Sequence, residues 1–271
     1  RAGARGGQQG WGDAVKTHVV FTRCVAAAMR IVPARCVVAG LMAALSALDV
    51  AAQADTAARR GAVFTRHDAG ILGIALAGSG LLIGADRSIS DQVRASSLHN
   101  SSVVRGVMDG GRVWGDPGVI VAGAGLWLAG ELNRDRRQRL IGIRSLEAIV
   151  ASGVVTSAIK GLAGRARPDR SPANPRDFMF ARGIREGSDF EAFPSGHATA
   201  AFAFAAAVDA EWARLAPDRP RWAAPALFSA AALTAVSRVF HDRHWTSDVL
   251  MGSAIGYVAG RAVVRWHSDR R

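Results

Sequence analysis

The sequence predicts an all-α protein, a helical bundle of about six to seven helices. After residue 55, apolar runs of helical length alternate with short segments that contain glycine, proline or charged residues. This pattern is typical of helices and the turns between them. Residues that favour strands are scarce apart from valine, and tyrosine occurs once. Because 49% of the 271 residues are hydrophobic, the chain can form the core of one domain.

Turn signals place the ends of the expected helices. Gly110-Gly111 ends the second helix, Asp116-Pro117 opens the third, and Pro168 prevents the fourth from continuing. Residues 168–192 are polar and rich in proline and arginine, which predicts a loop. In chain order, helices are expected over residues 71–85, 103–108, 118–132, 144–164, 196–214, 222–240 and 245–266.

The first part of the chain predicts export. Residues 1–28 are rich in glycine and arginine, and we expect them to be a disordered or non-native extension ahead of a start at Met29. A basic region, an apolar stretch over 36–48 and the small residues Ala52-Gln53-Ala54 follow, in the order of a secretory signal with its cleavage site. We therefore expect a signal peptide over 29–54, or an N-terminal anchor if it is not cleaved.

The mature domain is expected over 55–271, in the bacterial periplasm or cell envelope. Both cysteines, Cys24 and Cys36, precede it, so we expect it to form no disulfide and no cysteine metal site. Several of its apolar runs are shorter than the roughly 20 residues that span a bilayer. The later runs are more apolar, so the sequence leaves open whether the domain is soluble, peripheral or integral to the membrane.

Two further features bear on partners. Gly252, Gly256 and Gly260 form a ridge of small residues along one expected helix, which favours close contact with a second helix. The net charge of +12 attracts polyanions and anionic membrane surfaces alike. Because no recognised nucleic-acid motif accompanies this charge, we expect no nucleic-acid partner.

Two clusters of residues suit the binding of a phosphate group. Lys160 and Arg167 are seven residues apart, about two helical turns, so both cations project from one face near a helix C-terminus. Ser195, Gly196 and His197 precede an alanine-rich helix, where free backbone amides and the helix dipole attract anions. A structural alternative exists for each, because cations complement a helix C-terminus and serine is an ordinary N-cap.

A third cluster suits nucleophilic chemistry. His244 and Asp248 are spaced i, i+4 in an expected helix and can therefore touch. A carboxylate beside one imidazole nitrogen fixes the tautomer and leaves the other nitrogen free as a nucleophile. Arg238 adds a planar fork for phosphate oxygens. His241 lies close by in the sequence, and this reasoning does not separate it from His244.

Together the clusters resemble the three signature motifs of the type 2 phosphatidic acid phosphatase superfamily, which includes lipid phosphatases, bacterial non-specific acid phosphatases and vanadium-dependent haloperoxidases. The motifs read Lys160-x6-Arg167-Pro168, Pro194-Ser195-Gly196-His197 and Ser237-Arg238-x5-His244-x3-Asp248, in order over residues 160–248. The resemblance implies the helical fold of that superfamily and a phosphatase domain over 55–271. The residues before 160 carry no comparable signature.

The resemblance also implies a role for each residue. His244 would attack phosphorus to give a phosphohistidine, Asp248 would orient it, and His197 would protonate the leaving group. The phosphate-binding residues would be Lys160, Arg167, Ser195, Gly196 and Arg238. The substrate expected is a phosphorylated lipid, such as a phosphatidate or a prenyl diphosphate. Vanadate is expected to act as an inhibitor. No cofactor and no metal site is expected, because no metal-binding spacing is present.

Other functions remain compatible with the same motifs. One is a broad-specificity periplasmic acid phosphatase acting on soluble esters. Another is a haloperoxidase with vanadate as cofactor on His244, although a mature chain of 217 residues over 55–271 leaves little room for the additional helices of that branch. The last is a non-catalytic envelope protein that binds anionic lipid.

Overall fold

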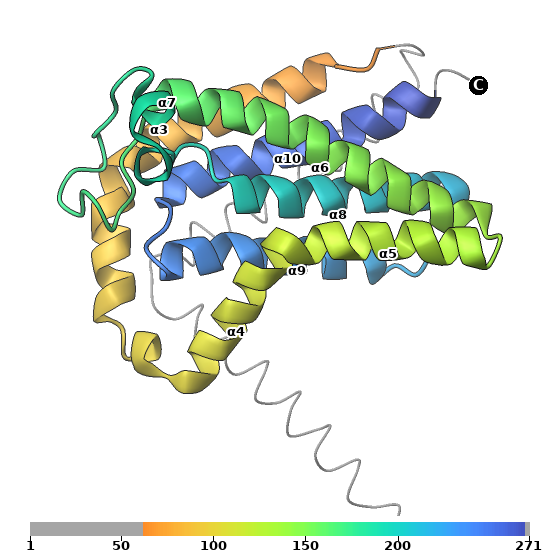
Figure 1. The fold of residues 1–271 in the computed structure, drawn as a ribbon, viewed down its shortest axis with the longest axis horizontal. Coiled ribbons are helices and arrows are strands. Elements are labelled where there is room, and N and C mark those ends of the chain that lie inside the picture. Colours follow the sequence, from red (N-terminus) through yellow and green to blue (C-terminus); the bar gives the residue numbers. More distant parts are fainter. Residues whose placement is uncertain (1–61, 269–271) are drawn as a thin grey trace, which may run out of the picture.

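A computed structural model describes residues 62–268, and this part of the chain is built from helices (Figure 1). The only pairing of extended backbone among these residues is an isolated antiparallel bridge between Arg165 and Phe178, so the all-α prediction is confirmed. The expected signal region over 29–54 lies outside the described residues. The seven longer helices are α3 (Arg66–Ala95), α4 (Ser102–Val113), α5 (Val119–Leu132), α6 (Arg136–Ala163), α8 (Gly196–Leu215), α9 (Ala223–Phe240) and α10 (Thr246–Ser268).

Short elements connect these helices. A 3-10 turn, η1 (Ser97–Asn100), precedes α4, and a single π turn, η2 (Trp114–Gly118), joins α4 to α5. The expected loop over 168–192 contains a helix of one to two turns, α7 (Arg182–Glu186), and a 3-10 turn, η3 (Ser188–Phe190). The last three long helices begin and end within a few residues of their predicted bounds.

The fourth predicted helix is longer than expected, because α6 begins at Arg136 and not at Arg144. Asp135 caps it, since its carboxylate accepts hydrogen bonds from the backbone amides of Arg137 at 2.8 Å and Gln138 at 3.2 Å. At the other end Gly164 adopts the left-handed conformation, with φ of 55°, which favours glycine. The charged residues Asp135, Arg136 and Arg137 therefore form the N-cap and the first two positions of the helix.

The expected end of the second helix at Gly110-Gly111 is wrong, because α4 continues to Val113. Gly111 lies against α9, where a Cβ atom would come within 3.0 Å of the carbonyl oxygen of Leu233. The glycine therefore allows two helices to approach closely and does not end one. Sequence alone does not separate these two uses of glycine, because both require the absence of a side chain.

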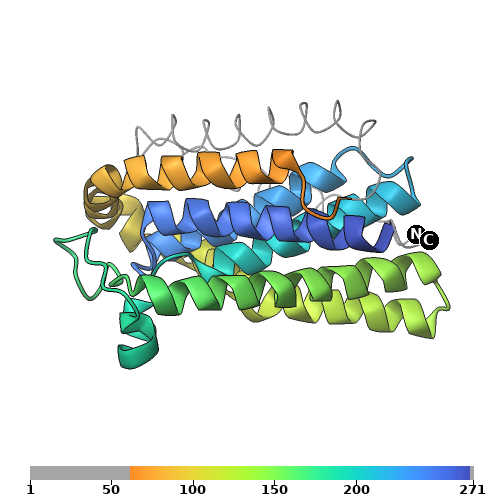
Figure 2. The same cartoon turned by 90° about the horizontal axis from the view of Figure 1, so that it is seen from above.

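α8 lies at the centre of the bundle and packs against α6, α9 and α10 (Figures 1 and 2). Every residue over 201–209 is buried, and most of them are alanine. The predicted glycine ridge of α10 contacts this helix: a Cβ on Gly252 would lie 2.5 Å from the carbonyl oxygen of Ser195, and one on Gly260 would lie 2.6 Å from that of Ala203. The ridge thus brings α10 against the backbone of α8. The contact begins at Ser195, the residue before the first residue of α8.

The ends of four long helices meet at one end of the bundle, beside the segment that carries α7 (Figure 1). α6 and α9 finish here, and α8 and α10 begin here. The start of α3 and the end of α10 lie at the opposite end, where Arg265 donates to the carbonyl oxygen of Val63 at 3.1 Å. This arrangement brings the three predicted motifs, which are far apart in sequence, to the same end of the bundle.

Three helices are long and apolar enough to cross a membrane: α3, α6 and α9. Large hydrophobic side chains on the first two are exposed, including Leu81 at 83% and Val154 at 67%. The predicted apolar run over 71–85 was too short to span because it stopped at the first charged residues, whereas α3 has 30 residues. The helices therefore suit a membrane protein better than the run lengths alone indicated.

Candidate active site

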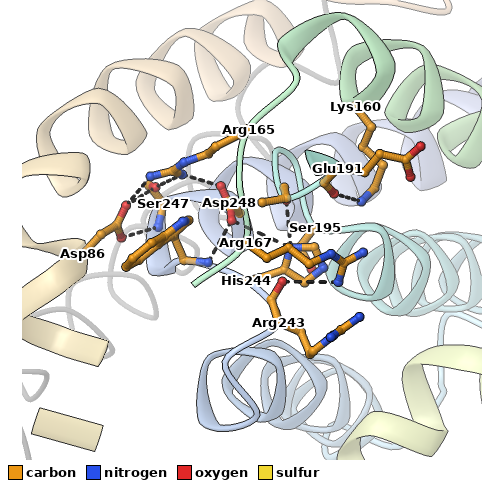
Figure 3. Close-up of polar contacts among 12 residues, drawn as sticks. Asp86, Lys160, Arg165, Arg167, Glu191, Ser195, Arg243, His244, Ser247 and Asp248 are labelled. Carbon is orange, nitrogen blue, oxygen red and sulfur yellow. Dashed lines mark hydrogen bonds and ion pairs between the residues drawn. The ribbon is translucent and has the colours of Figure 1, made fainter. Parts of the chain in front are cut away.

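The site begins with two cations held by the segment between α6 and α8 (Figure 3). Lys160, in the last turn of α6, donates from Nζ to the carbonyl oxygen of Glu191 at 2.5 Å. Arg167 donates from Nε to the carbonyl oxygen of Ser188 at 2.6 Å. Both acceptors are neutral carbonyl groups, so these bonds orient the cations without neutralising them. The predicted loop therefore fixes the positions of two positive charges.

Ser195 occupies the N-cap position of α8 but does not act as a cap. Its side chain makes no capping hydrogen bond, and within residues 62–268 its buried Oγ has no hydrogen-bond partner. Its backbone amide instead donates to the carbonyl oxygen of Asp248 at 2.9 Å, which ties the start of α8 to α10. A buried hydroxyl without a partner is costly in a folded protein, so the ordinary capping role does not account for this serine.

The guanidinium group of Arg238 also has nitrogen atoms without hydrogen-bond partners among the described residues. Only 4% of this residue is exposed, yet Nε and Nη1 are buried without a hydrogen-bond partner in the part of the chain that the structure describes. A buried guanidinium with free donors is unfavourable unless an anion completes it. Ser195 and Arg238 together therefore indicate that this end of the bundle is built to receive an anion.

The cations and the start of α8 surround a cavity of about 330 Å³. Five of the eight predicted site residues line it, and they are Lys160, Arg167, Gly196, His197 and His244. The other three, Ser195, Arg238 and Asp248, are buried and do not belong to the lining. Gly196 adds no side chain, so the free amides of the first turn of α8 can reach an anion in the cavity. The structure thus brings the predicted residues together.

His244 is oriented by a backbone carbonyl (Figure 3). Its Nδ1 lies 2.7 Å from the carbonyl oxygen of Ala192, and because a carbonyl only accepts, Nδ1 carries the proton. The Oδ2 atom of Asp248 is 3.7 Å from the same nitrogen, within ion-pair range but beyond a hydrogen bond. Nε2 is therefore the ring nitrogen with a free lone pair. Nδ1 therefore donates its hydrogen bond to the carbonyl oxygen of Ala192 and not to Asp248.

His244 and Asp248 contact each other as their i, i+4 spacing predicted, but the expectation that both lie in one helix is wrong, because α10 begins at Thr246 and His244 precedes it. Asp248 lies in the first turn, where its Oδ2 accepts from the backbone amide of Trp245 at 2.8 Å. This is the second half of a capping box. The two residues still approach each other because the turn before the helix folds back over its first residues.

Burial and neighbouring cations favour the neutral form of both histidines. Burial, followed by the charges of Arg238 and Lys160, lowers the pKa of His197 from 6.5 to about 3. Burial and the charges of Lys160, Arg167 and Arg238 also hold the pKa of His244 well below its usual value. A dianion in the cavity would offset these positive charges and raise both pKa values. His197 is therefore able to take up a proton when an anion binds.

Asp248 carries a charge at neutral pH. Burial raises its pKa to about 6, and the ion pair with Arg165 opposes that rise. Arg165 is fully buried and contacts two carboxylates, because Nη2 lies 2.9 Å from Asp86 and Nη1 donates to Asp248. Neither Arg165 nor Asp86 is among the residues predicted from the sequence. A signal for Asp86 was present, since it is an isolated acid at the end of the apolar run of α3.

His241, the alternative to His244 in sequence, lies outside the cavity lining. Its Nε2 is 3.3 Å from Oδ1 of Asp109 on α4. The structure therefore separates two histidines that the sequence did not. Among residues 62–268, no group of three or more histidine, cysteine, aspartate or glutamate side chains has the arrangement of a metal site.

Comparison with known families agrees with this geometry. The family model described as the PAP2 superfamily matches residues 142–271, which include all three motifs and the whole cavity wall from α6 onward. Residues 142–271 therefore belong to the PAP2 superfamily, as the motifs predicted. Asp86 and the rest of α3 lie before the matched region.

Curated relatives match part of the chain. A lipid A 1-phosphatase of Porphyromonas gingivalis is 35% identical over 96 residues, which cover 35% of this chain and 20% of that protein. A lipid A 1-phosphatase of Rhizobium johnstonii is 37% identical over 118 residues, which cover 43% of each chain. The chain thus spans less than half of the length of these relatives.

A solved structure has the same fold. It is the transmembrane PAP2-type phosphatidylglycerolphosphate phosphatase of Bacillus subtilis, with a TM-score of 0.56. The similarity covers 75% of this chain and 97% of that one, at 18% sequence identity. At this identity the likeness concerns the arrangement of helices, including those ahead of the matched family region.

Proposed function

We propose that the protein is a membrane-associated phosphatase that hydrolyses the phosphate group of a lipid through a phosphohistidine intermediate. The observation that carries this proposal is the cavity lined by Lys160, Arg167, His197 and His244, together with the unpartnered donors of the buried residues Arg238 and Ser195. Few ligands other than a phosphate group satisfy so many donors in so small a space.

The first step is attack on phosphorus by Nε2 of His244. The new N–P bond forms as the P–O bond to the leaving group breaks, and His197 gives its proton to the departing oxygen. Lys160, Arg167 and Arg238 stabilise the charge that spreads over the equatorial oxygens, together with the amides at the start of α8. His197 is suited to this step because the bound dianion supplies the charge that raises its pKa.

The second step releases the product. His197, now neutral, takes a proton from water, whose oxygen attacks the phosphohistidine and breaks the N–P bond. The products are inorganic phosphate, the free alcohol and unmodified His244. Three cations and a helix N-terminus supply the positive field that metal ions provide in other phosphatases, and this supports a reaction that does not require a metal.

A lipid substrate is supported by the placement of the cavity. The cavity lining includes Lys160 near the C-terminal end of α6, which is one of the helices long and apolar enough to cross a membrane. A phosphate on a lipid headgroup lies at the corresponding depth, at the edge of the hydrocarbon region. The relatives named for lipid A 1-phosphate hydrolysis make lipid A the first substrate to test.

The test is phosphate release by the full chain purified in detergent, with and without EDTA. The panel contains lipid A, phosphatidate, phosphatidylglycerol phosphate, a prenyl diphosphate and p-nitrophenyl phosphate. We expect turnover of at least one lipid phosphate that EDTA leaves unchanged and vanadate inhibits. Loss of activity in EDTA would contradict the metal-independent step, and preference for the soluble ester would make the protein a broad-specificity phosphatase.

A further inference from the structure

A buried charge network joins α3 to the turn that carries His244 (Figure 3). Asp86 and Arg165 are both fully buried, and their side chains form an ion pair of 2.9 Å. Arg165 also donates to Asp248 and, at 2.7 Å, to Oγ of Ser247. Two carboxylates therefore share one guanidinium in a region without solvent.

Asp86 also binds the start of α10 directly. Its Oδ1 accepts from the backbone amide of Ser247 at 3.0 Å, and its Oδ2 accepts from the hydroxyl of the same serine. From α3, Ser79 in turn donates to the carbonyl oxygen of Ser247 at 3.0 Å. Ser247, which is adjacent to Asp248 in α10, thus forms three hydrogen bonds with residues of α3.

The segment between α6 and α8 also contacts the turn that carries His244. Trp245 is fully buried, and its Nε1 donates to the carbonyl oxygen of Ala166 at 3.0 Å. Arg165 and Arg167 flank this carbonyl in sequence, so the segment that carries a cavity cation also holds the residue next to His244. Displacement of Arg165 would therefore move the turn relative to the cations.

The charges of the network have a consequence for His244. Asp86 and Asp248 contribute two negative charges and Arg165 one positive charge, so the network carries a net charge of about −1 beside the imidazole. This charge favours the positive imidazole that forms when Nε2 bonds to phosphorus. Removing the charge of Asp86 would leave the network neutral while the cavity cations stay unchanged.

We propose that Asp86 and Arg165 are positioning residues of this site, which hold Asp248 and the turn bearing His244 and keep a negative charge behind the nucleophile. This inference rests on the proposed phosphatase function and adds to it two residues outside the predicted motif positions. Asp86 belongs to α3, ahead of the region that the family model matches. The role is to act through Asp248 and His244, without contact with the substrate.

The experiment measures kcat and KM of the full chain in detergent with p-nitrophenyl phosphate, and the competitive inhibition constant of inorganic phosphate. Asp86→Asn removes one charge and retains the shape of the side chain. We expect kcat to fall about 10- to 100-fold, while the inhibition constant of phosphate stays within about twofold. A general loosening of the fold would change both quantities together.

Asp68→Asn is the matched control. Asp68 is also on α3, is 1% exposed and pairs with Arg265 at 2.5 Å, but it lies at the opposite end of the helix. We expect this variant to lose stability and retain the kcat of the wild type. Equal losses of kcat in both variants, or a kcat unchanged in folded Asp86→Asn, would overturn the proposed role.

If Asp86→Asn does not fold, Ser247→Ala tests the proposed positioning role instead. This variant keeps all three charges and removes only the hydroxyl between Asp86 and Arg165, so we expect a smaller fall in kcat with the same phosphate inhibition constant. An unchanged kcat in it would contradict the inference. A wild-type chain that releases no phosphate from any ester would instead reject the proposed function, before any variant is compared.

Discussion

Nδ1 of His244 lies 2.7 Å from the carbonyl oxygen of Ala192, two residues before the Pro194 that opens the second motif. The nucleophile proposed from the third motif is thus oriented by the backbone next to the second. A backbone acceptor keeps its position when side chains change, and it does not become protonated. The tautomer of His244 therefore depends on the packing of the segment before α8.

We expect His244→Ala to lower kcat by at least about 10³-fold and to retain binding of inorganic phosphate, because the three cations remain. Thermal unfolding with and without phosphate measures the binding, since a ligand of the native state raises Tm. Wild-type protein mixed with ³²P-labelled substrate and quenched in alkali should carry label on this histidine. Label recovered on His241, or on no residue, would contradict the assignment.

The effect of His197→Ala should depend on the leaving group. A lipid or sugar alkoxide needs a proton to depart, so we expect a loss of about 10²- to 10⁴-fold with lipid phosphates. A nitrophenolate departs without one, and the loss with p-nitrophenyl phosphate should be much smaller. Steady-state kinetics on the two substrates provide the comparison. An equal loss on both would assign His197 to phosphate binding.

Stability should fall as the pH decreases through the range in which the unfolded chain takes up protons. In the folded protein the pKa of His197 is lowered from 6.5 to about 3, and that of His244 is lowered as well. Below pH 6.5 the unfolded state therefore binds more protons than the native state, and the stability present above that pH is lost progressively toward pH 3. Denaturant unfolding of the wild type and His197→Asn measures this, and the variant should show the shallower slope. Identical slopes would exclude His197 as a source of the pH dependence.

The glycine ridge of α10 should tolerate no side chain. A Cβ on Gly256 would clash with the carbonyl oxygen of Thr199 on α8, and overpacking of this kind typically costs about 1–3 kcal/mol. We expect Gly256→Ala to lower Tm in detergent. Gly73→Ala is the control, because a Cβ there meets no atom within 4 Å, and alanine generally stabilises a helix relative to glycine. A similar Tm for both variants would contradict the close contact of α8 and α10.

Local patterns in the sequence determined the helical class, the last three helices, the glycine ridge and the eight predicted site residues. Each of these depends on residues close in sequence: apolar runs, turn signals and short motifs. The structure places Lys160 and His244 around one cavity, as the motifs required, although their chemical roles stay predictions. Family membership followed from the joint spacing of the motifs and is confirmed.

Only the tertiary structure decided which groups support those residues. Asp86 reaches Arg165 from 79 residues away in sequence, and His244 donates its hydrogen bond to a backbone carbonyl oxygen that no residue type reveals. The use of Gly111 as a contact, and not as a helix end, also depended on the position of α9. Local sequence fixes which chemical groups are available and where helices form. Long-range packing sets the distances and the burial on which hydrogen bonding and pKa depend.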